Sequence, residues 1–259
     1  MDELKKIAVL IDADNTPARV IRNTLDEIAT YGRVVVKRAY GNWSKPNLAS
    51  WLPVLNDLAI KAEQQTDYVT GKNTSDIALI IDAMDLLYTG LYDAFVIVSS
   101  DSDFTPLALR LHESGVMVIG VGETKTPVPF RNACDEFVII ENIGRSNSYG
   151  SSSSRSSGEP EPMASKAEFK ELHALLAKAW YTYEEEGYCN VCSANTYLRR
   201  AKPDFDCRTY GATSLPRLLE RFPHLYRVDR FAGRGGVTIV AYRCLNPSPA
   251  ALRELQEGY

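Results

Sequence analysis

The chain has 259 residues, a formal net charge of −4, 45% hydrophobic and 24% charged residues, a composition that is ordinary for a folded domain and excludes a largely disordered chain. Its longest apolar stretches, such as residues 7–11, are far shorter than the roughly 20 residues of a membrane-spanning helix, and the N-terminus does not resemble a signal peptide. We therefore expect a cytoplasmic protein that does not insert into a membrane.

Short apolar runs alternate with helix-like stretches over the first 145 residues. Several of these runs are apolar at consecutive positions, which is typical of parallel strands covered by helices on both faces. We expect strands at 7–11, 34–36, 68–69, 94–98, 116–121 and 137–140. We expect helices at 17–30, 50–64, 75–89 and 106–114. This order predicts a doubly wound α/β domain with a mostly parallel sheet, which binds ligands at the carboxyl edge of its strands.

Acidic residues stand where several of these predicted elements begin or end. Asp12 follows the first predicted strand, Asp101 and Asp103 follow the fourth, and Asp76 begins the third predicted helix. Because the carboxyl ends of parallel strands meet at one edge of a sheet, we expect these carboxylates to converge there.

Converging carboxylates repel one another and raise one another's pKa, so the cluster makes sense mainly if a cation neutralises it. Oxygen ligands without a nearby histidine favour Mg²⁺ or Mn²⁺ over zinc. Such ions activate a water molecule and stabilise phosphoryl oxygens. The chemistry that fits is the hydrolysis of a phosphodiester bond.

Each acid also has a purely structural interpretation, because an aspartate after a strand often caps a helix or forms a turn. For Asp14 we weigh capping and function about equally. For Asp101 and Asp103 we favour function, since two acids at positions i and i+2 of a strand-to-helix turn gain little structurally.

These motifs resemble the NYN domain of the LabA/DUF88 group, whose members are relatives of the PIN nucleases. The similarity covers about residues 5–142, and the motifs occur in the same order along the chain as in the family. It rests on the strings Ile11-Asp12-x-x-Asn15, Lys72-x-x-Ser75-Asp76 before an apolar helix that contains Asp82, and Ser99-Ser100-Asp101-Ser102-Asp103-Phe104. The resemblance implies a PIN-like fold and divalent-metal-dependent cleavage of RNA.

The resemblance also implies roles for single residues. Asp12, Asp76, Asp101 and Asp103 would be the catalytic and metal-binding acids, and Asn15 would orient Asp12 or a metal-bound water.

Two further polar residues would act on the site indirectly. Ser100 stands where the family often has glycine, so the approach of the backbone to a phosphate could differ there. Asp82 lies six residues beyond Asp76 and hence on another face of the helix, where a packing hydrogen bond is the alternative role.

Basic and aromatic residues near these motifs suit a single strand of RNA, whose bases stack while its phosphates pair with cations. Lys72 could contact a phosphate beside the metal ions, with a solvent-exposed lysine as the alternative. Packing in or around the core is the alternative for the two aromatic residues after the second strand. The RNA-binding candidates there are Lys37, Arg38, Tyr40, Trp43 and Lys45.

Residues 146–164 are mostly Ser, Gly, Pro and Arg, which predicts a flexible linker. It would join a first domain at 1–145 to a second at 165–246, followed by a C-terminal tail at 247–259. Residues 1–145 contain 14 basic and 20 acidic residues, whereas 160–259 contain 14 basic and 12 acidic ones. The acidic first domain suits phosphates only if its carboxylates hold cations.

The second domain opens with a capping-box signature, Ser165 followed three residues later by Glu168. We expect helices at 167–181, 193–201 and 214–222, and strands at 225–228 and 237–243. Helices followed by a glycine-tipped hairpin predict a small α+β domain of the winged-helix type. We expect the lone CxxC pair in this domain, Cys189 and Cys192, to pack as small side chains, because a structural zinc site would need a second pair.

Six short motifs follow one another in this segment: Gly187-Tyr188, Asn195-Thr196-Tyr197-Leu198, Pro203-Asp204-Phe205-Asp206, Tyr210-Gly211, Ser214-Leu215-Pro216-Arg217-Leu218-Leu219 and Leu225-Tyr226-Arg227-Val228. With these motifs the segment is similar to the OST-HTH/LOTUS domain over roughly residues 167–245. The similarity implies a winged helix that is associated with RNA binding and, in some members, with protein partners. A tethered RNA binder would raise the concentration of substrate at the nuclease site.

Arginines of this domain could form a basic surface for RNA, with ordinary solvated arginines as the alternative. Arg217 and Arg221 lie four residues apart on one face of the helix 214–222, and Arg208 lies upstream. These three are the candidate RNA contacts of the second domain.

The leading hypothesis is a metal-dependent endoribonuclease that recruits RNA through its second domain. The alternative is a non-catalytic RNA-binding adaptor whose acidic site holds a metal, and Ser100 keeps it open. A phosphatase or other phosphotransferase would release phosphate from small esters and would not need residues 160–259. Because the sequence has neither a P-loop nor a dinucleotide fingerprint, we do not expect a nucleotide cofactor.

Overall fold

The computed structural model of the chain describes residues 5–65, 74–143, 162–232 and 238–245. It divides into two compact units, Met1–Gly144 and Arg145–Tyr259. None of the helices in the described ranges combines the length and the apolar composition that crossing a bilayer requires.

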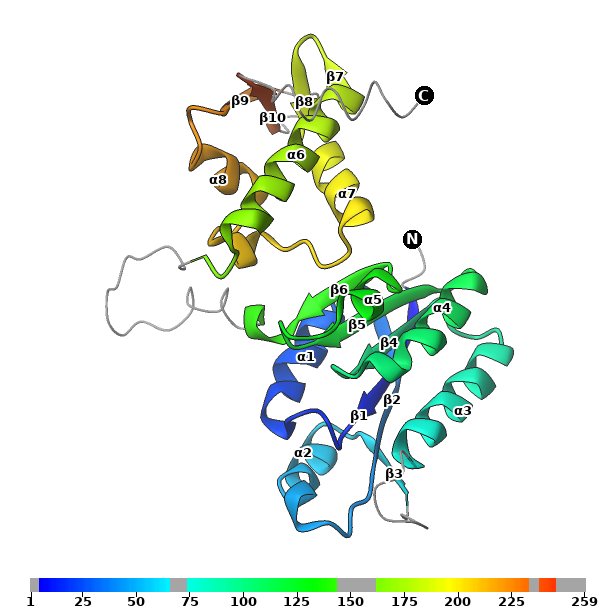
Figure 1. Cartoon of the computed structure of the whole chain (residues 1–259). Helices are drawn as coiled ribbons and strands as arrows, with labels where there is room; N and C mark the ends of the chain where they lie inside the picture. Colours follow the sequence, from blue (N-terminus) through cyan, green and yellow to red (C-terminus); the bar gives the residue numbers. More distant parts are fainter. Residues whose placement is uncertain (1–4, 66–73, 144–161, 233–237, 246–259) are drawn as a thin grey trace. The chain divides into compact units, whose positions relative to one another are not determined.

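Unit 1 is built on a parallel six-stranded sheet with the strand order β3-β2-β1-β4-β5-β6 (Figure 1). The strands are β1 (Lys6–Asp12), β2 (Arg33–Gly41), β3 (Lys61–Gln64), β4 (Ala94–Val98), β5 (Met117–Gly122) and β6 (Glu136–Ile139). The chain builds the sheet outward from β1 on one side, and then from β4 on the other. The carboxyl ends of β1 and β4 are therefore neighbours at the point where the strand order reverses, as the predicted doubly wound fold requires.

Helices cover both faces of this sheet. They are α1 (Ile21–Ile28), α2 (Trp51–Asp57), α3 (Thr74–Tyr88), α4 (Thr105–Glu113) and α5 (Val128–Asn132), with short 3-10 turns η1 (Ala18–Val20), η2 (Pro46–Leu48), η3 (Ser102–Phe104) and η4 (Ile140–Asn142). One hydrophobic core lies under α1 and α2, and a second lies under α3, α4 and α5.

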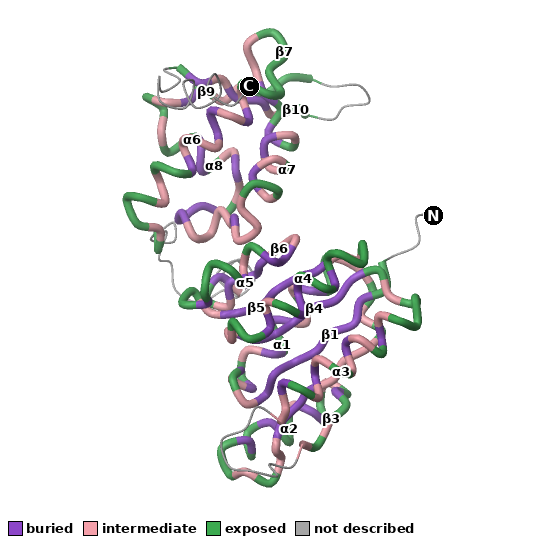
Figure 2. Tube along the Cα trace, turned by 45° about the vertical axis from the view of Figure 1, so that its right-hand side comes forward, coloured by how far each residue is buried: buried purple, intermediate pink, exposed green. Residues whose placement is uncertain are grey.

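The central strand β1 contributes to both cores and is buried over six of its seven residues (Figure 2). Ile7, Val9 and Ile11 belong to the core under α1 and α2, whereas Ala8 and Leu10 belong to the core under α3. This alternation follows from the two-residue period of a strand. Asp12 continues the second set, so it ends the strand on the face that α3 covers.

The prediction of one helix over residues 50–64 was wrong. Helix α2 ends at Asp57, the chain turns at Ala59 with a φ of 48°, and β3 begins at Lys61. Among the strands that the structure describes, β3 pairs with β2 alone. Its sequence Lys-Ala-Glu-Gln has the charge that is common on edge strands. It therefore lacks the apolar pattern that would reveal a strand. The strand expected at 68–69 lies outside the described residues.

Unit 2 consists of helices packed on an antiparallel sheet with the order β7-β8-β10-β9. Its elements are α6 (Lys166–Tyr183), β7 (Glu184–Glu185), β8 (Tyr188–Asn190), α7 (Val191–Ala201), η6 (Cys207–Tyr210), α8 (Leu215–Glu220), β9 (Tyr226–Ala232) and β10 (Thr238–Cys244). The predicted capping box is present, since the Ser165 N–H donates to Glu168 at 2.7 Å and the Glu168 N–H to Ser165 Oγ at 3.3 Å. The predicted second α+β domain is thus confirmed, and the short strands β7 and β8 are additions to it.

Candidate active site

Asp12 is the most buried acid of the candidate site, with 1% of its surface exposed. Its Oδ2 accepts hydrogen bonds from Ser99 Oγ at 2.7 Å and Asn15 Nδ2 at 2.9 Å, and its Oδ1 accepts one from the Asn15 N–H at 3.2 Å. Burial raises the pKa of Asp12, although the hydrogen bonds from Ser99 and Asn15 oppose the rise. The carboxyl group is therefore held in one orientation by its neighbours.

Ser99, the first residue after β4, links the ends of the two central strands. Its hydroxyl donates to Asp12 and accepts a hydrogen bond from the Asp101 N–H at 3.1 Å. This chain of hydrogen bonds couples the position of the Asp101 loop to that of Asp12. We predicted no role for Ser99 from the sequence, although its place at the end of a strand, two and four residues before Asp101 and Asp103, was a signal for one.

Asp14 connects the same edge to α3. Its Oδ2 accepts a hydrogen bond from Ser75 Oγ at 2.8 Å, and Ser75 lies in the first turn of α3, next to Asp76. The alternative of Asp14 as a helix cap is not observed, because Pro17 occupies the N-cap of the following turn, η1. Asp14 thus belongs to the carboxylate cluster.

Asp76 is 8% exposed and lies among the other acids. Burial and then repulsion from four carboxylates, in the order Asp12, Asp101, Asp14 and Asp103, raise the pKa of Asp76 to about 6. A group at the start of α3 can be affected by all four only if the ends of β1 and β4 face that helix. The structure thus brings together the acids that the sequence predicted to converge.

Asp101 and Asp103 form one turn after β4. The Asp101 side chain caps η3 by accepting a hydrogen bond from the Asp103 N–H at 2.9 Å. Our expectation that the pair gains little structurally was therefore wrong for Asp101, while Asp103 is exposed to solvent. The neighbouring Ser100 Oγ accepts a hydrogen bond from the Glu123 N–H at 2.9 Å, which ties this turn to the loop after β5.

The chemistry of this cluster suits a hard divalent cation, because its donors are carboxylate oxygens in mutual repulsion. In the described part of the chain, however, no three acidic, histidine or cysteine side chains already stand in positions to hold a metal ion. The oxygen donors are thus of the type that such an ion prefers, and a bound cation would have to draw the carboxylates closer to one another.

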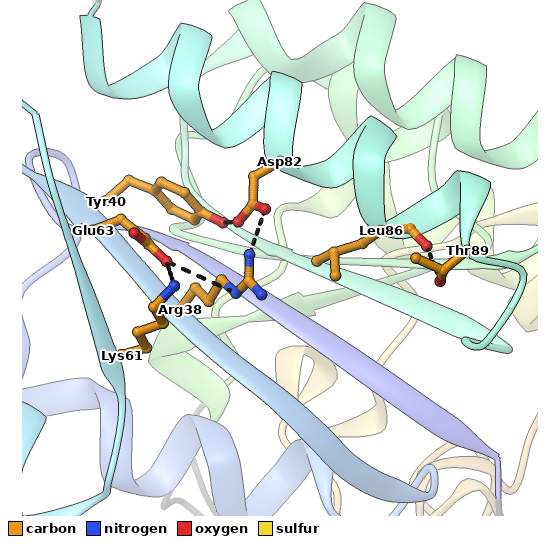
Figure 3. Close-up of polar contacts among 7 residues, drawn as sticks. All are labelled: Arg38, Tyr40, Lys61, Glu63, Asp82, Leu86 and Thr89. Atoms are coloured by element: carbon orange, nitrogen blue, oxygen red, sulfur yellow. Dashed lines mark hydrogen bonds and ion pairs between the residues drawn. The ribbon is translucent and has the colours of Figure 1, made fainter.

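Asp82 lies away from this edge, in a contact between α3 and β2 (Figure 3). Its two carboxylate oxygens accept hydrogen bonds from Arg38 Nη1 and the Tyr40 hydroxyl. Glu63 of β3 pairs with Lys61 at 2.6 Å and lies 3.9 Å from Arg38 Nε. Asp82 therefore has the packing role that the sequence analysis held as its alternative.

The same contact bears on two proposed RNA ligands. Tyr40 is only 2% exposed, so its ring cannot stack on a base without rearrangement. The guanidinium group of Arg38 is paired with Asp82 while its side chain stays partly exposed, so an RNA contact there stays a prediction. Sequence showed two suitable residue types but not that residues 38 and 40, two apart on a strand, point to the same face.

The other RNA-binding candidates of unit 1 within the described residues are all partly exposed. Lys37 Nζ donates to the Leu58 carbonyl, and Trp43 packs edge-on against Trp51 with a centroid distance of 6.2 Å. Both side chains are partly exposed, as is Lys45. Lys72 lies outside the described residues.

The three arginines proposed for unit 2 have different surroundings. Arg208 is paired with Asp206 at 2.7 Å, and Arg221 Nη1 donates to the carbonyls of Tyr210 and Gly211. Arg217 is exposed on α8.

Comparison with known families agrees with this architecture. The NYN domain matches residues 6–141, more than half of the chain, and the chain therefore belongs to the NYN family. An OST-HTH/LOTUS domain follows at residues 164–238. NYN domains are PIN-like nuclease domains and OST-HTH domains bind RNA, which supports a nuclease and RNA-binding role at the level of the families.

No curated protein matches the chain. Among solved structures, one similar protein is a protein of unknown function from Vibrio parahaemolyticus, with 22% identity, a TM-score of 0.45, and coverage of 54% of this chain and 95% of that one. Another is an uncharacterised protein from Nitrosomonas europaea, with 21% identity, a TM-score of 0.29, and coverage of 37% and 89%.

Proposed function

We propose that this member of the NYN family is a divalent-metal-dependent endoribonuclease whose RNA is recruited by the OST-HTH domain. The observation that supports this most directly is the cluster of acids at the reversal point of the sheet, whose repulsion and burial raise the pKa of Asp76 to about 6. A fold gains nothing from such repulsion unless a positive charge enters the site.

Asp12, Asp76, Asp101 and Asp103 would hold Mg²⁺ or Mn²⁺, which when bound supplies an activated water and charge stabilisation at the phosphate. The protein's own contribution is positioning. Asp12 is fixed by three hydrogen bonds from Ser99 and Asn15, so it does not need to be reoriented when substrate arrives.

The exposed members of the site face solvent and hence an incoming RNA strand. Asp103 and Asn15 are both exposed, and the Asn15 amide, held on Asp12, can orient a water or a ribose hydroxyl at the mouth of the site. Asp76, whose pKa lies near 6, can hold or release a proton near neutral pH while no cation is bound.

The test uses the purified full-length chain, end-labelled RNA, and Mn²⁺, Mg²⁺ or EDTA. Asp101→Asn should reduce metal-dependent cleavage by roughly a hundredfold or more, since it weakens the hold on the cation, and losing one group that stabilises transition-state charge costs about that much. Asp26→Asn is the matched control, because Asp26 is an exposed acid on α1, and it should cleave like the wild type.

An adaptor without turnover is the competing function, and it predicts that wild type and Asp101→Asn bind RNA equally and cleave none of it. Release of phosphate from small esters, unaffected by loss of residues 160–259, would instead indicate a phosphatase. Either result would refute the nuclease proposal. Binding of a protein by the OST-HTH domain is a further possibility for that domain's family and is not needed for cleavage.

A further inference from the structure

A cavity of about 410 Å³ opens in unit 2 between α7, η6 and the beginning of α8. Its volume falls within the roughly 300–1,000 Å³ of small-ligand sites. Phe205, Leu215 and Pro216 form an apolar part of its lining. The proposed function assigns no role to this cavity.

Two cationic side chains and one carboxylate line the cavity. Arg199 comes from α7 and Arg208 from η6, while Asp206 is the ion-pair partner of Arg208. All three act on the same thiol: burial and then Asp206 raise the pKa of Cys207 to about 12, while Arg199 and Arg208 oppose the rise. The three charged groups therefore lie near one point, where Asp206 offsets Arg208 and Arg199 adds a second cation that suits an anion such as a phosphate.

The guanidinium group of Arg208 is fixed in place. Its Nε donates to Asp206 Oδ2 at 2.8 Å, while the Arg208 N–H donates to Asp206 Oδ1 at 2.8 Å. A guanidinium plane that is already oriented can stack on a nucleobase without losing further side-chain freedom.

Polar groups that can bind the edge of a base complete the cavity. Asn195 and Ser214 line it, and neither side chain has a hydrogen bond to another of the described residues. An amide both donates and accepts, which is what the edge of a nucleobase requires.

We propose that this cavity binds one unpaired nucleotide, with its base between the apolar wall and the Arg208 plane, its edge at Asn195, and its phosphate at Arg199. The proposal rests on the proposed function in one respect, namely that the nucleotide belongs to an RNA strand. A flat surface of arginines would bind phosphates alone, whereas a cavity with an apolar wall and a free amide takes a base as well.

The first test measures RNA binding by the full-length chain in EDTA, so that cleavage does not interfere, with a fluorescently labelled single-stranded oligoribonucleotide of mixed sequence. Arg199→Gln should raise the Kd about tenfold, as expected for the loss of a hydrogen bond to a charged group. It should also lower the salt slope of binding by about 0.7. Arg200→Gln is the matched control, because Arg200 is the next residue of α7, exposed and outside the cavity.

Arg200→Gln makes the same change in net charge and should raise the Kd by less than about threefold, as a purely long-range effect would. Arg199→Lys keeps the charge but not the planar guanidinium group, and its Kd should lie between those of the wild type and Arg199→Gln. Equal losses in Arg199→Gln and Arg200→Gln would overturn the proposal, because they would show that only net charge matters.

A second test uses Cys192, an exposed cysteine in the cavity lining. Iodoacetamide should alkylate it selectively, because Cys134, Cys189 and Cys244 are buried and the raised pKa of Cys207 keeps it protonated. RNA should slow this alkylation, and the alkylated chain should bind RNA at least several-fold more weakly. In Cys192→Ser the reagent should cause no further change in RNA binding, whatever the affinity of the untreated variant.

Nucleoside 5′-monophosphates form a separate arm of this test. Protection of Cys192 by RNA, with or without protection by the free nucleotide, supports the proposal. Protection by the free nucleotide alone, or by neither, overturns it. All these measurements concern binding, so they can be separated from the proposed nuclease activity. If the chain binds RNA in this way but does not cleave it, only the nuclease proposal is refuted. If it cleaves RNA but shows none of these effects, only the proposed nucleotide site is refuted.

Discussion

Replacing Asp76 with asparagine should stabilise unit 1 when no divalent cation is present. The asparagine side chain is close in shape to a protonated aspartate, but it carries no charge to be repelled by the other acids. In the wild type, burial and four carboxylates raise the pKa of Asp76 from an ordinary value of 3.8 to about 6. The folded chain therefore holds this proton to a higher pH than the unfolded chain does.

The sign and size of the effect follow from proton linkage. Between pH 4 and 6 the folded state binds the extra proton, so the contribution of Asp76 to stability falls as the pH rises and stays low above about pH 6. Raising the pKa of Asp76 from 3.8 to about 6 corresponds to about 3 kcal/mol in the free energy of unfolding. Because Asp103 and Asn15 are exposed, water screens part of the repulsion. We therefore expect Asp76→Asn to raise the free energy of unfolding by roughly 1–2 kcal/mol at pH 7.5.

The measurement is urea unfolding followed by tryptophan fluorescence in a Trp180→Phe background. Since the chain has three tryptophans, this leaves Trp43 and Trp51, both in unit 1, as reporters. The gain from Asp76→Asn should shrink as the pH is lowered from 7.5 toward 4. Asp85→Asn, which removes an exposed acid from the same helix, should show no such gain.

Mn²⁺ should reverse the order of stability. A cation present at a hundred times its Kd adds about 2.7 kcal/mol to the free energy of unfolding of the wild type. Asp76→Asn lacks one of the carboxylates that would bind the cation and should be stabilised much less. If Asp76→Asn is less stable than the wild type at pH 7.5 in EDTA, or if its effect is the same at every pH, the acids do not repel one another as described and the argument for a cation site fails.

The remaining predictions concern residues that hold the site in place. Asp82→Ala should destabilise unit 1 by about 1–3 kcal/mol, because it leaves the Tyr40 hydroxyl without its partner. Cleavage by this variant at saturating Mn²⁺ should nevertheless stay within about threefold of the wild type. A loss of cleavage as large as that of Asp101→Asn would give Asp82 a catalytic role. Ser100→Ala should cost about 1 kcal/mol through the lost hydrogen bond from the Glu123 N–H and leave cleavage almost unchanged in the same assays. A large rise in cleavage with Ser100→Gly would show that the serine restrains turnover and would favour the adaptor hypothesis for the natural chain.

The convergence of the acids could be predicted from sequence because it depends on topology. The runs ending at Ile11 and Val98 are apolar at every position, which marks buried parallel strands, and the carboxyl ends of such strands share an edge. The sequence did not show which strands are neighbours in the sheet. The structure shows that β1 and β4 lie side by side.

Other features depend on side-chain direction and could not be read from residue types. Strand β3 is a polar edge strand that has no apolar alternation, so its residues looked like the end of a helix. Arg38 and Tyr40 looked like an RNA-binding pair, but they share a strand face with α3, where Asp82 engages both. Finding this contact required knowing which helix covers which face of the sheet.

The alternating burial of β1 has a consequence for how this family can change in length. Asp12 faces α3 because it lies two and four positions beyond Leu10 and Ala8, which belong to the core on that side. One residue inserted or deleted between them would keep every acid of the motif, yet it would turn the carboxylate to the opposite face of the sheet. Insertions are therefore expected to be tolerated in the loops of this domain and rejected within β1, however conservative the inserted residue.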